Sequence, residues 1–122
     1  MSTQKVLIVE DEKPMAKALA LKLGHEGVEA EVVHDGKEGL EKARTGGYAL
    51  IILDLIMPVM DGFTFLETLK KEGVKTPVVV ASNLSQEGDA ERAKKLGAVD
   101  YFIKSNTPLA DIVAHITKIL NA

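Results

Sequence analysis

The sequence contains no cysteine, and that absence excludes disulfides, thiol catalysis and thiolate metal sites. No apolar run approaches membrane-spanning length, and the first residues, MSTQK, lack the apolar stretch of a signal peptide. The net charge of -3 gives no electrostatic reason to expect nucleic acid or an anionic membrane as a partner. These absences predict a soluble, cytoplasmic protein that engages neither membrane nor nucleic acid.

What is present indicates one globular domain. The 122 residues fit a single domain, 1–122, that can bury a sizeable core, and no second catalytic domain fits beside it. Hydrophobic residues make up 46% of the chain against 27% charged residues, a balance typical of a globular rather than a disordered protein. No repeat, low-complexity tract or linker interrupts the chain.

Strand-sized segments rich in Val, Ile and Leu alternate with stretches of helical periodicity. The helical stretches have recognisable ends, with Gly24 and Gly73 as stops and Thr107 as an N-cap before Pro108. Because parallel strands need crossover connections, this alternation predicts an α/β fold, a doubly wound five-stranded parallel sheet with five helices on two faces. The predicted strands are residues 5–9, 29–33, 49–53, 77–81 and 99–103.

Polar residues within the strands predict their order in the sheet. A central parallel strand is apolar on both faces, whereas an edge strand can keep polar residues. The second segment carries Glu29 and Glu31 and the fifth carries Asp100, which predicts that these two strands are the edges. The flavodoxin-like order 2-1-3-4-5 puts edges there and places a ligand site beyond the carboxyl ends of the first and third strands.

Polar side chains stand at the predicted carboxyl ends of four strands. Taken singly, each has a structural explanation, because acids cap helices, Ser-Asn pairs make turns and a lysine is usually solvated. Together they gather carboxylates, a hydroxyl and one ammonium around one crevice, which favours a site over separate coincidences. They are Glu10-Asp11-Glu12 after the first strand, Asp54 after the third, Ser82-Asn83 after the fourth and Lys104 after the fifth.

The charges of this group predict a divalent cation. Clustered carboxylates stay ionised together only beside something cationic, and Lys104 alone supplies too little positive charge. Carboxylate oxygens without His or Cys suit Mg²⁺, which takes one or two carboxylates and a phosphate. An acidic first loop would repel the phosphate of a flavin, and the chain has no GxxxxGK[ST] loop for a nucleoside triphosphate.

The segments LIVEDE, LDLIMPVMDG, VVVASN and YFIKS, in this order and at these spacings, closely resemble the receiver domain of bacterial two-component response regulators. The resemblance covers essentially the whole chain and suggests a stand-alone receiver similar to the chemotaxis regulators. It implies that Asp54 takes a phosphoryl group from a phosphohistidine on a sensor histidine kinase or phosphotransfer protein, in a phosphorelay. The chain would then be a phosphoacceptor rather than an enzyme, and it would signal to a downstream protein as a monomer or weak dimer.

The resemblance also implies a ligand set for Mg²⁺. Asp11 matches the direct metal ligand of the family, and Glu10 matches its acidic neighbour. Asp54 and the main-chain carbonyl of Ile56 would complete the protein's share of the metal shell.

Further positions match the phosphoryl and switch groups of the family. Lys104 and the Ser82 hydroxyl match the groups that hold the phosphoryl oxygens. Tyr101 matches an aromatic residue that turns inward when that hydroxyl moves, coupling the site to the surface of the fourth helix, fifth strand and fifth helix. Ile56 and Leu84 match two positions that flank the path of the hydrolysing water. Because neither apolar side chain can orient a water by hydrogen bonding, we expect slow self-dephosphorylation.

One position departs from the family pattern. The family usually has proline after the fifth-strand lysine, often with a cis bond, whereas Ser105 follows Lys104 here. A cis bond without proline costs roughly 3 kcal/mol, so the direction in which Lys104 points stays open. Two alternatives therefore stand beside the switch. One is a receiver-like interaction module that does not depend on phosphorylation, and the other is an aspartyl-phosphate phosphatase, whose DxD pattern Asp54-Leu55-Ile56 lacks.

Overall fold

The computed structural model describes residues 4–84 and 86–121, and in these ranges strands and helices alternate as predicted. Met1 to Thr3, which begin the segment interpreted as free of a signal peptide, lie outside the described residues. The strands are β1 Lys5–Val9, β2 Glu29–Val33, β3 Leu50–Leu53, β4 Val78–Ser82 and β5 Ala98–Ile103. The helices are α1 Lys13–His25, α2 Gly36–Thr45, α3 Gly62–Lys71, α4 Asp89–Lys95 and α5 Leu109–Leu120.

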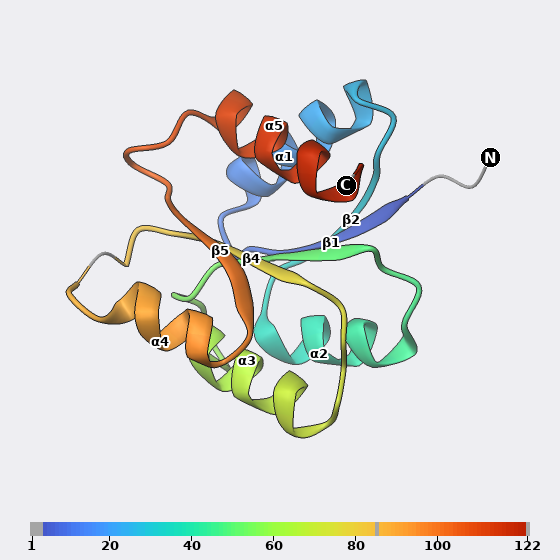
Figure 1. The fold of residues 1–122 in the computed structure, drawn as a ribbon. Helices are drawn as coiled ribbons and strands as arrows, with labels where there is room; N and C mark the ends of the chain where they lie inside the picture. Colours follow the sequence, from blue (N-terminus) through green and yellow to red (C-terminus); the bar gives the residue numbers. More distant parts are fainter. Residues whose placement is uncertain (1–3, 85, 122) are drawn as a thin grey trace.

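The strands form one parallel sheet in the order β2-β1-β3-β4-β5 (Figure 1). The predicted strand order and both predicted edge strands are therefore confirmed. β1 is paired on both sides, with Val6 opposite Ala30 of β2 and Leu50 of β3. This pairing brings the carboxyl ends of β1 and β3 side by side in the middle of the sheet, with β4 next to β3.

Helices α1 and α5 cover one face of the sheet, and α2, α3 and α4 cover the other (Figure 1). Successive side chains of a strand point to opposite faces, and both sets are apolar here. In β1, Leu7 and Val9 belong to the core on the α2–α3–α4 side, whereas Val6 and Ile8 belong to the core on the α1–α5 side. The prediction of helices on two faces is confirmed. Because both faces of the central strands are buried in close-packed apolar cores, these strands are held rigidly.

One of the two predicted helix stops is confirmed. Gly73 follows α3 in the left-handed region at φ 73°, whereas Gly24 lies inside α1, which ends at His25 and is followed by the left-handed Gly27 at φ 78°. The predicted cap of the last helix is wrong by one position, because the N-cap is Pro108 rather than Thr107. Pro108 has an extended ψ of 145°, so the helical conformation begins only at Leu109. Within the described residues, no helix combines the length and apolar character that a membrane crossing needs.

Candidate functional site

The ends of β1 and β3 place two carboxylates at the centre of the sheet's carboxyl edge. The N–H of Asp54 donates to the Val9 carbonyl at 3.0 Å, and the N–H of Glu10 donates to the Val33 carbonyl at 3.0 Å. These bonds continue the sheet by one residue past each strand, so both acids stand on rigid backbone. Asp54 and Glu10 are each only 4% exposed.

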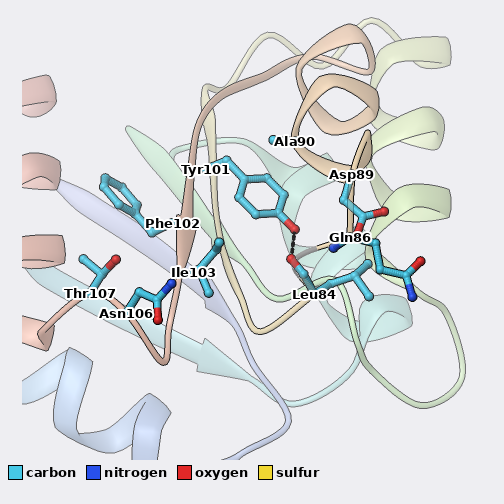
Figure 2. A pocket seen from close by; sticks show the side chains of 9 residues that line it. All are labelled: Leu84, Gln86, Asp89, Ala90, Tyr101, Phe102, Ile103, Asn106 and Thr107. Carbon is cyan, nitrogen blue, oxygen red and sulfur yellow. Dashed lines mark hydrogen bonds between the residues drawn. The ribbon is translucent and has the colours of Figure 1, made fainter.

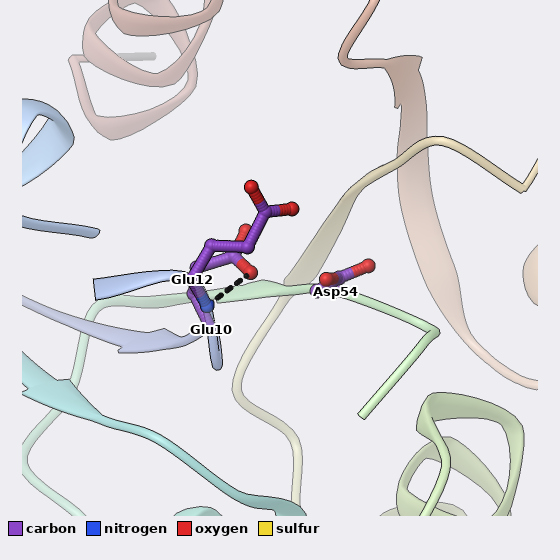
Figure 3. Close-up of side chains that lie close together, drawn as sticks. All are labelled: Glu10, Glu12 and Asp54. Atoms are coloured by element: carbon purple, nitrogen blue, oxygen red, sulfur yellow. Dashed lines mark hydrogen bonds between the residues drawn. The ribbon is translucent and has the colours of Figure 1, made fainter. Parts of the chain in front are cut away.

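A third carboxylate, that of Glu12, forms an acidic group with Glu10 and Asp54 (Figure 3). One oxygen from each of the three side chains lies within 4.8 Å of the others. The N–H of Glu12 donates to Oε2 of Glu10 at 3.2 Å, which ties the two glutamates together. The side chain of Glu12 is 59% exposed, so the group opens to solvent on that side.

One ammonium, that of Lys104, contacts all three carboxylates. Its Nζ donates to Glu10 Oε1 at 2.7 Å, to Glu12 Oε1 at 3.1 Å and to Asp54 Oδ2 at 3.3 Å. The Lys104 side chain is only 7% exposed. Three carboxylates around a single ammonium leave an excess of negative charge, and hard oxygen donors with such an excess fit a divalent cation such as Mg²⁺.

The pKa values of Glu10 and Lys104 reflect this crowding. Burial, with the charge of Asp54 added, raises the pKa of Glu10 to about 7, although the hydrogen bond from Lys104 acts to lower it. Burial acts to lower the pKa of Lys104, but the hydrogen bond to Glu10 and the charge of Asp54 outweigh it, so this pKa lies above its usual value. Lys104 therefore stays charged at neutral pH, whereas Glu10 holds its proton part of the time.

Asp54 has two further hydrogen-bond donors. The Ser82 hydroxyl donates to its Oδ1 at 2.7 Å, and the N–H of Ile56 donates to the same oxygen at 3.2 Å. Ser82 is the last residue of β4 and is fully buried. Asp54 thus faces a hydroxyl, an ammonium and a main-chain N–H. Donors of these kinds stabilise the negative charge that develops in the transition state when a chemical group is transferred to a carboxylate.

The loop after Asp54 folds back closely on its own start. The N–H of Gly62 donates to the Leu55 carbonyl at 2.9 Å, and a Cβ at position 62 would lie 2.6 Å from the Leu55 Cα. Only glycine fits that close approach. Val59 in this loop is 78% exposed and has φ 71°, a left-handed conformation that a β-branched residue rarely adopts.

Tyr101 lines a cavity of about 380 Å³ between β5, the start of α4 and the turn before α5 (Figure 2). Its hydroxyl donates to the carbonyl of Leu84, two residues beyond Ser82. Burial and the charges of Asp89 and Asp54 raise the pKa of Tyr101 above its usual value. A hydrogen bond therefore links the aromatic ring on β5 to the segment that follows the Ser82 hydroxyl.

The structure brings together most of the residues that the sequence singles out. The connected residues are Glu10, Asp54, Ile56, Ser82 and Lys104, with Leu84 and Tyr101 joined through the segment after β4. Asp11, predicted to be a direct metal ligand, is half-buried in the bend after β1 and does not belong to the carboxylate group found in the part of the chain described. Glu12 belongs to the carboxylate group, although the sequence did not predict Glu12 as a metal ligand. The signal that could have identified it is its position in the acidic run Glu10-Asp11-Glu12.

The direction of Lys104, left open by the sequence, is inward to the acidic group. Its peptide bond to Ser105 is trans. Of the two apolar residues predicted to flank the path of water, the Ile56 side chain is 55% exposed, and Leu84 is half-buried and lines the cavity beside Tyr101.

The chain is similar in sequence to bacterial regulators. The Response regulator receiver domain family matches residues 6–117. The transcriptional regulatory protein PcoR of Escherichia coli is 35% identical over 117 residues, which cover 96% of this chain and 51% of PcoR. The response regulator ArlR of Staphylococcus aureus (strain Mu50 / ATCC 700699) is 34% identical over 116 residues, which cover 95% of this chain and 52% of ArlR. The chain spans about half the length of the curated relatives it matches.

Solved structures share the fold. The receiver domain of the Francisella response regulator 1452 superposes with a TM-score of 0.90 at 29% identity, covering 98% of both chains. The chemotaxis protein CheY4 of Vibrio cholerae superposes with a TM-score of 0.86 at 26% identity, covering 97% of this chain and 99% of that one. The predicted fold class is confirmed by these superpositions together with the strand order.

Proposed function

This chain belongs to the response regulator receiver domain family, and we propose that Asp54 is its phosphoryl acceptor in a two-component regulatory system. Receiver domains of this family are phosphorylation-based switches. The observation that carries the proposal is the joint contact of Asp54 with the Ser82 hydroxyl and the Lys104 ammonium at the ends of three neighbouring strands. The receiver domain is proposed to extend over residues 1–122, around the 6–117 that match the family.

In the proposed reaction, a carboxylate oxygen of Asp54 attacks the phosphorus of a phosphohistidine on a sensor histidine kinase or phosphotransfer protein. The oxygen–phosphorus bond forms as the phosphorus–nitrogen bond breaks, and the departing imidazole takes up a proton from water. Two anions approach each other in this step, so a cation near Asp54 lowers its barrier. The Lys104 ammonium, 3.3 Å from Asp54, is close enough to do so, and the Ser82 hydroxyl can turn to a phosphoryl oxygen.

We propose that Mg²⁺ assists this transfer, held by Asp11, Asp54 and the Ile56 carbonyl, with Glu10 acting through water. The excess of carboxylate charge over the single Lys104 ammonium supports the proposal. When bound, Mg²⁺ supplies a Lewis acid that polarises the phosphoryl oxygens and offsets the carboxylate charge. The role of Asp11 rests on its match to the family pattern.

The phosphorylated state is proposed to be long-lived. Ile56 and Leu84 offer no polar side-chain atom that could orient a hydrolysing water, so self-dephosphorylation should be slow. The test follows loss of the phosphoryl group in wild type and in an Ile56→Asn, Leu84→Glu double mutant, with Mg²⁺ saturating in both. A shorter lifetime in the double mutant supports the role of these residues, and an equal or longer one refutes it.

The output of the switch is proposed to be a protein contact on the side of the molecule that carries Tyr101. The bond from Tyr101 to Leu84 supports this, because it ties that surface to the segment after Ser82 (Figure 2). Of the relatives, PcoR is named a transcriptional regulatory protein and ArlR a response regulator. For this chain, a cytoplasmic location, a monomer or weak dimer and an output without nucleic acid stay predictions.

Beryllium fluoride, which mimics a phosphoryl group on a carboxylate, tests the acceptor. With Mg²⁺ present, a nuclear magnetic resonance titration is expected to show binding to wild type and none to Asp54→Asn. Asp61→Asn is the matched control, because Asp61 caps α3 by accepting from the Thr64 N–H and asparagine caps equally well. Equal binding by Asp54→Asn would remove Asp54 from the mechanism. A partner that binds identically with and without beryllium fluoride would favour the phosphorylation-independent module.

A further inference from the structure

A hydrogen bond joins the segment after Ser82 to the turn after Lys104. The Ser105 N–H donates to the Asn83 side-chain Oδ1 at 2.8 Å. Asn83 directly follows the hydroxyl that contacts Asp54, and Ser105 directly follows the lysine that does so. The bond therefore links the backbones behind two of the groups that face the acceptor.

The backbone around Ser105 leaves its N–H available for this bond. The N–H of Lys104 donates to the Ser82 carbonyl at 3.0 Å and extends the pairing of β4 with β5 by one residue. The N–H of Asn106 donates to the Ile103 carbonyl at 3.0 Å, which closes a tight turn with Lys104 and Ser105 at its centre. The N–H between these two lies beyond the sheet, and the Asn83 amide oxygen accepts it.

The residue type at position 105 decides whether the bond exists. A proline there has no N–H, so it could not donate to Asn83 at all. Ser105 and Asn83 are both exposed, and little packing holds this turn in place. In this chain a hydrogen bond takes over the restraint that a proline ring would provide covalently.

Lys104 depends on that restraint when its charged partners change. In the unphosphorylated chain its Nζ is held by Glu10, Glu12 and Asp54 together. A phosphoryl group on Asp54 replaces one of those contacts with a new one, and the ammonium must move to meet it. The backbone of the turn then sets the direction in which the Lys104 side chain points. This direction matters, because a small error in the position of the ammonium weakens its effect on phosphoryl transfer.

We propose that Asn83 is a positioning residue, whose side-chain oxygen holds the Lys104–Ser105 turn so that the ammonium meets the phosphoryl group on Asp54. The inference rests on the proposed function of Asp54. Asn83 touches no reacting atom and acts through the backbone that follows Lys104. Asn83 is not among the residues proposed to hold Mg²⁺, so the role concerns the placement of the ammonium rather than the binding of the metal.

The test compares two affinities in wild type and Asn83→Ala. The affinity for beryllium fluoride at saturating Mg²⁺ is expected to fall about twofold to tenfold in the variant, the change that loss of one neutral hydrogen bond brings. The affinity for Mg²⁺ alone is expected to stay the same. Asn106→Ala removes the same side-chain atoms from the neighbouring turn position and should match wild type in both affinities.

Nuclear magnetic resonance reads the bond itself. The Ser105 amide proton is expected to shift upfield in Asn83→Ala, and in Asn83→Asp, whose carboxylate is a stronger acceptor, it is expected to lie at or downfield of its wild-type position. These spectra need neither metal nor beryllium fluoride.

The outcomes separate this inference from the function beneath it. Wild-type chain that binds no beryllium fluoride contradicts the proposed function, and the role of Asn83 falls with it. Wild-type binding with an unweakened Asn83→Ala overturns the positioning role alone. An Asn83→Ala protein that loses Mg²⁺ affinity to the same degree also overturns it, because that result indicates general disruption of the site.

Discussion

Replacing Asp54 by asparagine is expected to stabilise the metal-free protein, although it removes a carboxylate that accepts three hydrogen bonds. Three carboxylates face the single Lys104 ammonium in the folded chain. In the unfolded chain the same charges are dispersed in water. Asp54→Asn takes one charge out of the buried group and keeps a side-chain oxygen that can accept from Ser82 and Ile56.

The size of the stabilisation expected for Asp54→Asn follows from the pKa of Glu10, which rises from 4.5 to about 7 on folding. One pKa unit corresponds to about 1.4 kcal/mol, so ionising Glu10 above pH 7 costs the folded state about 3 kcal/mol. Burial is the largest cause of the shift, and the charge of Asp54 is a smaller one. Removing that charge should therefore return on the order of 1 kcal/mol, or about 4 °C in melting temperature. Lys104 keeps its contacts to Glu10 and Glu12 in the variant.

Thermal melts at pH 8, with chelator and with Mg²⁺, test the argument. With Mg²⁺ at 100 times its dissociation constant, wild type should gain about 2.7 kcal/mol from ligand binding and overtake the variant, which has lost a metal ligand. Asp35→Asn is the control, because it removes a carboxylate that caps α2 and lies outside the acidic group. A metal-free Asp54→Asn protein that melts clearly below wild type would show that the carboxylates do not repel one another as described.

Three further changes probe the same region. Gly62→Ala should destabilise the fold by about 2–3 kcal/mol in urea melts, because the new Cβ would lie 2.6 Å from the Leu55 Cα. The control Gly24→Ala has open space around its Cβ within α1 and should be neutral or stabilising. Equal effects of the two substitutions would show that the close approach at Gly62 does not limit stability. Val59→Asn should stabilise by about 1 kcal/mol, because asparagine tolerates φ 71° and the exposed valine gives up little burial, and a lower melting temperature would argue against strain there. Metal-free wild type should gain about 2 kcal/mol as pH falls from 8 to 5, because the folded chain binds the Glu10 proton more tightly than the unfolded chain, and stability is lost as pH rises from 4.5 through about 7. Glu10→Gln should lose most of this dependence, and an unchanged pH profile in that variant would assign the titration elsewhere.

The strands and their order could be predicted because the burial of each strand determines its pattern of apolar and polar residues. β1 and β3 are apolar on both faces and lie in the centre, whereas Glu29 and Glu31 mark β2 as an edge. The start of α5 was the weaker prediction, since a helix boundary depends on the ψ angle of one residue, Pro108, which sequence does not determine.

The site could be predicted as a set of residues but not as a set of contacts. Carboxyl ends of neighbouring strands converge in any sheet of this order, so Asp54, Ser82 and Lys104 had to approach one another. The reach of Lys104 to Glu12 depends on side-chain rotamers, which no spacing rule supplies. The left-handed Val59 was unforeseen for a different reason, because valine is among the residues least expected there.

Whether Asp54 is the phosphoryl acceptor is tested most directly by locating the phosphoryl group after treatment with acetyl phosphate and Mg²⁺. Borohydride reduction converts an aspartyl phosphate to homoserine, and peptide mass spectrometry then identifies the modified residue. We expect homoserine at position 54 in wild type, none in Asp54→Asn, and strongly reduced modification of both Lys104→Ala and chelator-treated wild type. Homoserine at another aspartate, or equal modification of Asp54→Asn, would contradict it.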